Sequence, residues 1–324
     1  ALEAILRIYN RQGRRDNKYK ARIKILVKEM GIEAFKTKVI EEWQRIKDGP
    51  QTLTEKEIER CKSFFIELPY TATQDNPDTL TEALQKEPLF LNWYRRNVKQ
   101  HKRPGYAIAT IALKETGTAP GDVTDVQLEH IADLSDEYSF GEARVSHRQN
   151  VVLADVAQEE LYALWQQLRN QSLASENLEL LTDMICCPGG DFCALANAKS
   201  IPIAESIQRE FNNHDQLLDI GEITLNISGC MNACGHHHVG NIGILGVDKK
   251  GEEFYQISLG GSSKNEASLA KVLGPAFAEE EIPFVIRKII AVYKDNRIDG
   301  EKFLGTYQRI GLEPFKDKIY AKAD

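Results

Sequence analysis

The sequence has no long hydrophobic run and no excess of positive charge. None of its apolar stretches reaches the roughly 18 residues that a membrane-spanning helix needs, so we expect no membrane as a partner. A net charge of −7 and an isoelectric point near 5.7 argue against nucleic acid as a partner. Nothing in the chain reads as a secretory segment, so we expect a cytoplasmic protein that forms no disulfides.

Cysteine is scarce as well, but four of the six cysteines form two closely spaced pairs. Cys187 and Cys193 enclose Pro-Gly-Gly-Asp-Phe, and Cys230 and Cys234 enclose Met-Asn-Ala. Structural zinc sites more often use Cys-x2-Cys to Cys-x4-Cys knuckles, whereas a [4Fe-4S] cluster needs four thiolates and accepts irregular spacing. The spacing therefore favours an iron–sulfur cluster and leaves zinc, or thiols without metal, as alternatives.

The two remaining cysteines have different interpretations. Cys186 stands directly beside Cys187, so a set of disulfides among the paired cysteines would leave thiols without a partner. Cys61 lies in the amphipathic stretch 58–65, where we expect it to be a small buried hydrophobic residue.

The second cysteine pair carries a resemblance to a known family. Gly229-Cys-Met-Asn-Ala-Cys-Gly235, followed by Val239-Gly-Asn-Ile-Gly-Ile-Leu-Gly246, resembles the sirohaem and [4Fe-4S] domain of assimilatory sulfite and nitrite reductases, most of all the sulfite reductase hemoprotein. The resemblance implies that Cys187, Cys193, Cys230 and Cys234 ligate the cluster. It also implies that Cys234 bridges the cluster to the iron of sirohaem, and it makes the zinc and disulfide interpretations minor.

The middle of the chain alternates strand and helix patterns. Hydrophobic periodicity predicts strand, helix, strand, strand, helix at 106–113, 124–134, 141–146, 150–153 and 158–168. This order is most of a ferredoxin-like unit. Further along, we expect a helix over 194–211 that Pro202 kinks or divides, and strands at 225–228, 242–247 and 254–259.

A sequence repeat links the two ends of the chain. Gly31-Ile-Glu-Ala-Phe-Lys-Thr-Lys-Val-Ile40 recurs as Gly311-Leu-Glu-Pro-Phe-Lys-Asp-Lys-Ile-Tyr320, and each copy follows an apolar helix pattern. The chain is 42% hydrophobic and 27% charged, which is enough to bury a sizeable core in about two domains. We therefore predict an α+β protein whose last domain is the second copy of a pseudo-two-fold repeat.

Four segments follow from these patterns. They are the tail of a first repeat (1–50), a helical linker (51–103), a ferredoxin-like half domain (104–172) and the sirohaem and [4Fe-4S] domain (173–324). Because the family is built from two such halves around sirohaem, we expect the N-terminal half to be missing from this chain. Alone, the chain is then expected to be inactive and to hold sirohaem weakly.

The resemblance extends to contacts with sirohaem. Segment 141–150 resembles the family segment that lies against the macrocycle, where Arg144 and Arg148 would pair with its carboxylates. The predicted cofactor contacts are Arg144, Arg148, Gln149, Asn150, Asn232 and Cys234. The alternative is a hairpin whose arginines face water. The triplet His236-His237-His238 receives no ligand role, because consecutive side chains point in different directions.

Positive charge is concentrated at the start of the chain. Residues 1–50 hold 13 Lys and Arg against 7 Asp and Glu, which is typical of a solvated helix face or of an anion site. The basic run consists of Arg14, Arg15, Lys18, Lys20, Arg22 and Lys24. The family places two cations over the distal face of sirohaem, and the best register makes them Arg22 and Lys24, with Lys20 as the fallback.

These assignments predict a six-electron reduction of an anion. No side chain stores electrons, so a cluster coupled to sirohaem must deliver them. Lys24, at a position where nitrite enzymes tend to lack lysine, favours sulfite reduction to sulfide over nitrite reduction to ammonia. A non-catalytic iron–sulfur protein or a zinc-stabilised protein is the alternative from another class. The sequence leaves open whether the electron donor is ferredoxin or a flavoprotein.

Overall fold

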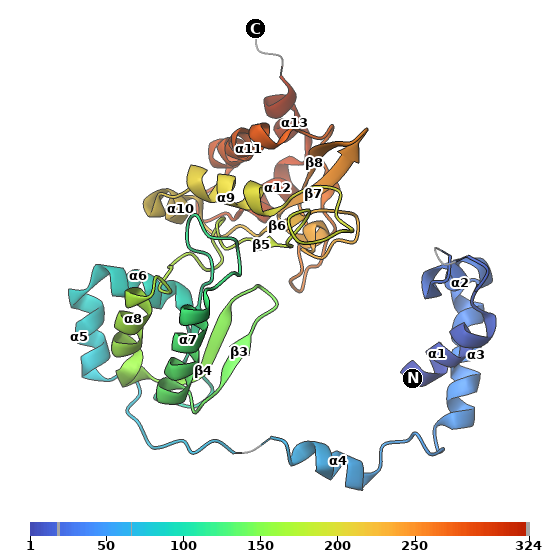
Figure 1. The fold of residues 1–324 in the computed structure, drawn as a ribbon, viewed down its shortest axis with the longest axis horizontal. Helices are drawn as coiled ribbons and strands as arrows, with labels where there is room; N and C mark the ends of the chain where they lie inside the picture. Colours follow the sequence, from blue (N-terminus) through green and yellow to red (C-terminus); the bar gives the residue numbers. More distant parts are fainter. Residues whose placement is uncertain (18–19, 66, 322–324) are drawn as a thin grey trace. The chain divides into compact units, whose positions relative to one another are not determined.

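The structure is a computed structural model that describes residues 1–17, 20–65 and 67–321 (Figure 1). Lys18 of the basic run lies outside these ranges. The chain divides into two compact units, residues 1–68 and 69–324. No helix within the described ranges is long and apolar enough to cross a membrane.

All the regular structure among the described residues of the first unit is helical. Its helices are α1 (Leu2–Gln12), α2 (Ile23–Met30), α3 (Ile32–Ile46) and α4 (Glu55–Lys62). Ile8, Leu26 and Phe35, one from each of the first three helices, form its small buried core. Gly31 separates α2 from α3 with a φ of 85°, a left-handed conformation that glycine adopts without strain.

The structure corrects the expectation for Cys61. Helix α4 buries none of its residues, and Cys61 is exposed. The segment is helical as the pattern predicts, but none of the described residues of this unit buries the apolar side of α4. A period of 3.6 predicts a helix and cannot say whether a core lies against it.

The second unit begins with an antiparallel sheet in the order β1-β2-β4-β3. Its strands are β1 (Val98–Gln100), β2 (Tyr106–Ile111), β3 (Ala143–Val145) and β4 (Val151–Ala157). The helices of this region are α5 (Asp78–Lys86), α6 (Pro88–Asn97), α7 (Asp125–Tyr138) and α8 (Leu161–Asn170). All four helices contribute to one apolar core with β2 and β4. The predicted ferredoxin-like half domain is therefore confirmed as a helix-covered sheet.

The region expected to be a linker contributes to this core. Phe90 and Trp93 of α6 are fully buried, and Leu80 of α5 packs with them. The short strand β1, which the sequence did not predict, directly follows α6 and pairs with β2. Only tertiary packing distinguishes such helices from a solvated linker.

The rest of the second unit is a mixed sheet in the order β5-β6-β7-β8-β9. Its strands are β5 (Ile185–Cys186), β6 (Leu225–Ser228), β7 (Ile242–Lys249), β8 (Glu252–Leu259) and β9 (Lys271–Val272). Strands β5, β6 and β7 are parallel neighbours, and β8 and β9 continue the sheet antiparallel. The accompanying helices are α9 (Ile201–Glu210), α10 (His214–Ile220), α11 (Ile282–Asn296), α12 (Phe303–Ile310) and α13 (Glu313–Tyr320).

The helix expected over 194–211 begins later than predicted. Helix α9 starts at Ile201, and Pro202 stands in its first turn. Proline has no amide hydrogen, and the first turn of a helix needs none, so Pro202 begins the helix and does not kink it.

The repeat is visible in the fold. Helices α11, α12 and α13 follow one another as α1, α2 and α3 do, and Gly311, with a φ of 76°, separates the last two as Gly31 does. Phe35 and Phe315 occupy matching positions in the repeated sequence, and both are buried. The repeated motif therefore lies in the same order of helices and buries the same phenylalanine in both copies.

We expect Phe315→Ala to lower the free energy of unfolding of the second unit by about 3–5 kcal/mol, because it opens a cavity at a fully buried position. Urea denaturation followed by circular dichroism measures this. The exposed Lys318→Ala on the same helix should change stability by less than about 0.5 kcal/mol. Equal effects of the two substitutions would contradict the shared role of Phe35 and Phe315.

Candidate metal centre

The two cysteine pairs begin at the ends of neighbouring parallel strands. Cys187 directly follows β5, and Gly229-Cys230 directly follows β6. Strands β5 and β6 pair in parallel, with Ile185 opposite Asn226 and Cys186 opposite Ile227. Because parallel strands share one carboxyl edge, both cysteine loops leave the sheet on the same side.

Glycine lets the two loops touch. A Cβ at Gly229 would lie 2.7 Å from the Cα of Gly189 and 2.6 Å from the carbonyl oxygen of Ala198, closer than real Cβ atoms approach. The carbonyl of Gly229 in turn accepts hydrogen bonds from the amides of Asn197 and Ala198, at 2.8 and 3.0 Å. The two loops therefore pack directly against each other.

The sulfur of Cys187 already accepts a hydrogen bond. The amide of Gly229 donates to its Sγ at 3.1 Å, and the hydroxyl of Ser200 lies 3.7 Å from the same sulfur. Amide donors stabilise a negatively charged sulfur, which is the form that binds iron. Cys230 is buried, Cys187 and Cys193 are partly exposed, and Cys234 is exposed.

The second loop turns tightly around a glycine. Ala233 has a left-handed φ of 57°, and the amide of Gly235 donates to Ser228 Oγ at 3.1 Å. Any side chain at Gly235 would collide with the carbonyl oxygen of Ile227. Asn232 lies exposed between the two cysteines of this loop.

Cys186 points into the protein and not toward the loops. It is buried, and its Sγ donates to the carbonyl of Cys187 at 3.2 Å. Burial raises the pKa of its thiol well above the usual range, since a thiolate would lose its solvation there. Cys186 is therefore suited to packing and not to binding a metal.

The histidine triplet does not form a metal site either. His237 is buried, and burial lowers its pKa to about 4, so its ring is neutral. Its Nδ1 has no hydrogen-bond partner among the described residues. Within the same ranges, no group of three or more His, Cys, Asp or Glu is placed to hold a single metal ion.

The hairpin between β3 and β4 reaches the first cysteine loop through Gln149. Its side-chain amide donates to the carbonyl of Cys186 at 2.8 Å and accepts from the amide of Cys186 at 2.9 Å. Asn150 is buried and donates to Asp183 at 3.0 Å. These contacts attach the ferredoxin-like sheet to the strand that precedes Cys187. Sequence patterns alone do not predict this pairing, because it joins residues 37 positions apart.

The two predicted arginines take different positions. Arg148 donates to Asp183 at 3.0 Å, ahead of β5. Arg144 is exposed and pairs with Glu142 at 2.5 Å. The structure thus brings Gln149 close to the cysteine loops and leaves the guanidinium of Arg148 at the amino end of the strands.

The predicted anion-binding cations belong to the first unit. Lys24 is exposed in the first turn of α2, Arg22 directly precedes that helix, and Lys20 stands before it. Lys20 and Lys24 would share a helix face only if both were helical, and the helix begins at Ile23.

We expect Cys187→Ser or Cys230→Ser to abolish cluster binding, because each removes one of four corner ligands. Cys186→Ser should retain the cluster, since its thiol faces the core. Iron, acid-labile sulfide and zinc analysis of the purified proteins measures this. Equal iron loss from Cys186→Ser would contradict the ligand assignment, and zinc in place of iron in the unsubstituted protein would contradict a cluster.

Gln149→Leu should lower the free energy of unfolding by about 2–4 kcal/mol, because it leaves two buried backbone groups of Cys186 unpaired. Faster iron release from the loaded protein should accompany it. Gln166→Leu, at an exposed position on α8, is the matched control. Denaturant titration measures the free energy of unfolding, and the rate of iron loss to a chelator measures iron release. Unchanged values for Gln149→Leu would count against a structural role for the bonds between Gln149 and Cys186.

Comparison with known proteins identifies the family of this arrangement. The chain matches the family model of the nitrite and sulphite reductase 4Fe-4S domain over residues 1–47 and 179–324. It matches the nitrite/sulfite reductase ferredoxin-like half domain over residues 100–171. The match of one family model to both ends of the chain agrees with the repeat.

Individual relatives include both kinds of reductase. The chloroplastic ferredoxin–nitrite reductase of Betula pendula is 25% identical over 283 residues, which cover 83% of this chain and 41% of that protein. Sulfite reductase [ferredoxin] 1 of Mycolicibacterium paratuberculosis is 26% identical over 313 residues, or 93% of this chain and 49% of that protein. The chain spans less than half the length of these relatives.

Solved structures show the same fold. The NirA protein of Mycobacterium tuberculosis superposes with a TM-score of 0.64 at 23% identity, over 94% of this chain and 50% of that one. Dissimilatory sulfite reductase I superposes with a TM-score of 0.56 at 13% identity, over 87% of this chain and 90% of that one. The cofactors of this family are a [4Fe-4S] cluster and sirohaem. With its paired cysteine loops on a shared strand edge, this chain belongs to the nitrite and sulphite reductase family.

Proposed function

We propose that this chain carries the cluster-binding part of an enzyme that reduces sulfite to sulfide with six electrons. The observation that carries the proposal is the meeting of both cysteine loops at the carboxyl edge of β5 and β6. Four thiolates from two loops at one edge suit a cubane cluster, and the amide of Gly229 already stabilises one of them.

Each cysteine has a role in this proposal. Cys187, Cys193, Cys230 and Cys234 would hold the cluster. Cys234 is the exposed one, so its sulfur is open to a second metal centre outside the protein's core. When bound, the cluster and sirohaem would supply electrons one at a time, which no side chain can do.

The residues of the chain would manage the anion and its protons. A cation beside a reacting oxyanion stabilises the charge that develops on a departing oxygen. Lys24 suits this role better than Arg22, because a lysine ammonium can also act as a proton donor in catalysis, whereas a guanidinium is suited to binding the anion. Asn232, Arg144, Arg148, Gln149 and Asn150 remain predicted contacts of sirohaem. Gln149 of the hairpin hydrogen-bonds to Cys186, which directly precedes the first cysteine loop.

Nitrite reduction to ammonia is the second candidate, because several relatives are ferredoxin–nitrite reductases. We take ferredoxin over a flavoprotein as the electron donor, since relatives of both kinds carry ferredoxin in their names. Turnover of the full-length protein with sulfite and with nitrite, at equal ferredoxin supply, separates the substrates. A kcat/KM at least tenfold higher for nitrite would reject the choice of sulfite.

In the full-length protein, Lys24→Ala should lower sulfite turnover by about tenfold or more, with the visible spectrum nearly unchanged, because the lysine acts on the anion and not on the metal centres. Lys28→Ala, one turn along α2 and also exposed, is the control and should leave turnover unchanged. If both variants behave alike, the basic run is a solvated face.

A further inference from the structure

A cavity of about 150 Å³ lies at the amino ends of β6 and β7, away from the cysteine loops. Thr224 directly precedes β6, Asn241 directly precedes β7, and Ser262 follows the antiparallel β8. The cysteines leave the opposite end of the same sheet. At roughly 3.3 Å per residue, the five steps from Thr224 to Gly229 separate the two ends by roughly 16 Å. The cavity is therefore a separate place from the candidate metal centre.

Three cations and two carboxylates line this cavity: Arg148, Lys264, Lys302, Glu179 and Glu222. Both carboxylates are already neutralised. Glu222 pairs with Lys302 at 2.6 Å and lies 3.9 Å from Lys264, while Glu179 pairs with Lys99 at 3.3 Å. Burial by itself would raise the pKa of Glu179, but the charge and hydrogen bond of Lys99 lower that pKa. The pKa of Glu179 therefore lies below its usual range.

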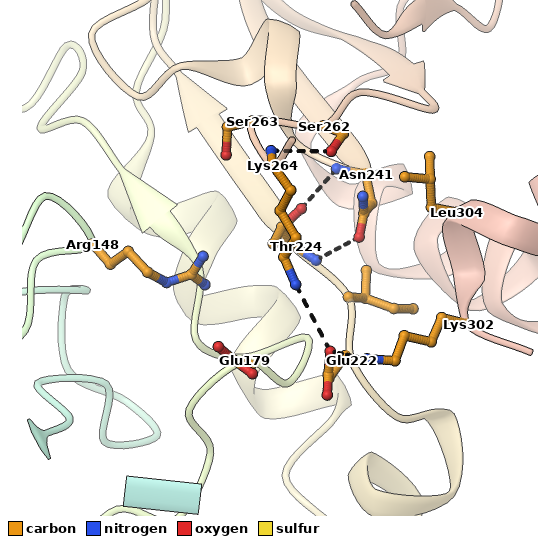
Figure 2. Close-up of a pocket in the computed structure, with 11 residues that line it drawn as sticks. Arg148, Glu179, Glu222, Thr224, Asn241, Ser262, Ser263, Lys264, Lys302 and Leu304 are labelled. Atoms are coloured by element: carbon orange, nitrogen blue, oxygen red, sulfur yellow. Dashed lines mark hydrogen bonds and ion pairs between the residues drawn. The ribbon is translucent and has the colours of Figure 1, made fainter. Parts of the chain in front are cut away.

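Arg148 has hydrogen-bonding capacity left over. Its Nη2 bonds to the carbonyl and carboxylate oxygens of Asp183, whereas no hydrogen bond of its Nη1 is recorded among the described residues. Figure 2 shows this guanidinium extending toward Thr224 and Lys264 across the cavity. A guanidinium has five N–H donors, so Arg148 can still donate to an acceptor placed in the cavity.

A further positive charge stands behind Arg148. Lys114 is almost fully buried and donates to the carbonyls of Arg148 and Gln149, at 3.0 Å each. Burial lowers its pKa to about 8, so it stays mostly protonated at neutral pH. The charge around the cavity is thus positive in sum. A metal ion would meet this excess of cations and two carboxylates that lysines already occupy.

The remaining lining combines hydroxyl groups with Asn241 and the aliphatic side chains of Ile223 and Leu304. Ser262, Ser263 and Thr224 supply hydroxyl groups. Thr224 and Asn241 are held rigidly, because each backbone amide donates to the other's side chain, at 3.0 and 2.9 Å. A volume near 150 Å³ corresponds to about five waters, which accommodates a five-atom oxyanion with some water and excludes a tetrapyrrole.

We propose that this cavity binds a small free oxyanion of the sulfate, sulfite or phosphate type, held by Arg148 and Lys264. The oxyanion accepts from Nη1 of Arg148, since Nη2 is bonded to Asp183, and from the ammonium group of Lys264. It joins the β3–β4 hairpin, which carries Arg148, to the loop after β8, which carries Lys264. Binding therefore adds a contact between the ferredoxin-like sheet and the cysteine-bearing sheet. Arg148 is also a predicted contact of sirohaem, but the test uses neither sirohaem nor turnover, so its failure is distinguishable from failure of the proposed function.

The test is calorimetric titration of the full chain with inorganic phosphate, at constant ionic strength set by chloride. Binding at one site should raise the melting temperature by roughly a few degrees, because the anion binds the folded state alone. Sulfate and sulfite should compete with phosphate, and glycine should not. Tighter binding of glycine than of phosphate would overturn the proposal in favour of a zwitterion, and an unchanged melting temperature with no heat of binding would overturn it outright.

Substitutions locate the site. Arg148→Gln should weaken phosphate binding by roughly tenfold or more, since a hydrogen bond to a charged group is lost. Lys264→Gln should weaken it severalfold, and it keeps the test valid if Arg148→Gln fails to fold, because Lys264 is exposed. Lys271→Gln, exposed on β9 and outside the cavity, is the matched control. Equal phosphate affinity in Lys264→Gln and Lys271→Gln would place the anion elsewhere and refute the assignment.

Discussion

The parallel pairing of β5 with β6 is the constraint on which the candidate metal centre depends. It places Cys187 and Cys230 at one edge of the sheet, although 43 positions separate them in the chain. The contact between Gly189 and Gly229 then holds the two loops together at a distance that no other residue permits. A cluster with four thiolate ligands needs this convergence before any metal chemistry can begin.

A second constraint connects the sheets of the larger unit. The side chain of Gln149 takes the place of a neighbouring strand along the free edge of β5, bonding both backbone groups of Cys186. Asp183 accepts from Arg148, Asn150 and the amide of Glu179 around the start of the same strand. Buried polar groups with full sets of partners specify one arrangement, because any other would leave them unpaired. The strand that leads into the first cysteine loop is therefore held on both edges.

The two ends of this sheet carry different chemistry. Sulfur donors and close glycine contacts occupy the carboxyl end, where backbone amides can point at a ligand. Cationic side chains and hydroxyls surround the cavity at the amino end. Arg148 lines this cavity and pairs with Asp183, and it also stays a predicted contact of sirohaem.

The sequence by itself determined the cysteine pairs, the three-helix repeat and the ferredoxin-like order of elements, because these depend on local spacing and hydrophobic period. Strand β6 was predicted to the residue, whereas the start of α9 and the exposure of Cys61 were wrong. Tertiary structure decided which helices join a core, as α5 and α6 do, and which remain uncovered, as α4 does. It also decided the bonding of Gln149 and the direction of Arg148. A contact between residues far apart in the chain does not change the hydrophobic period of the sequence around either residue, so local sequence patterns cannot predict it.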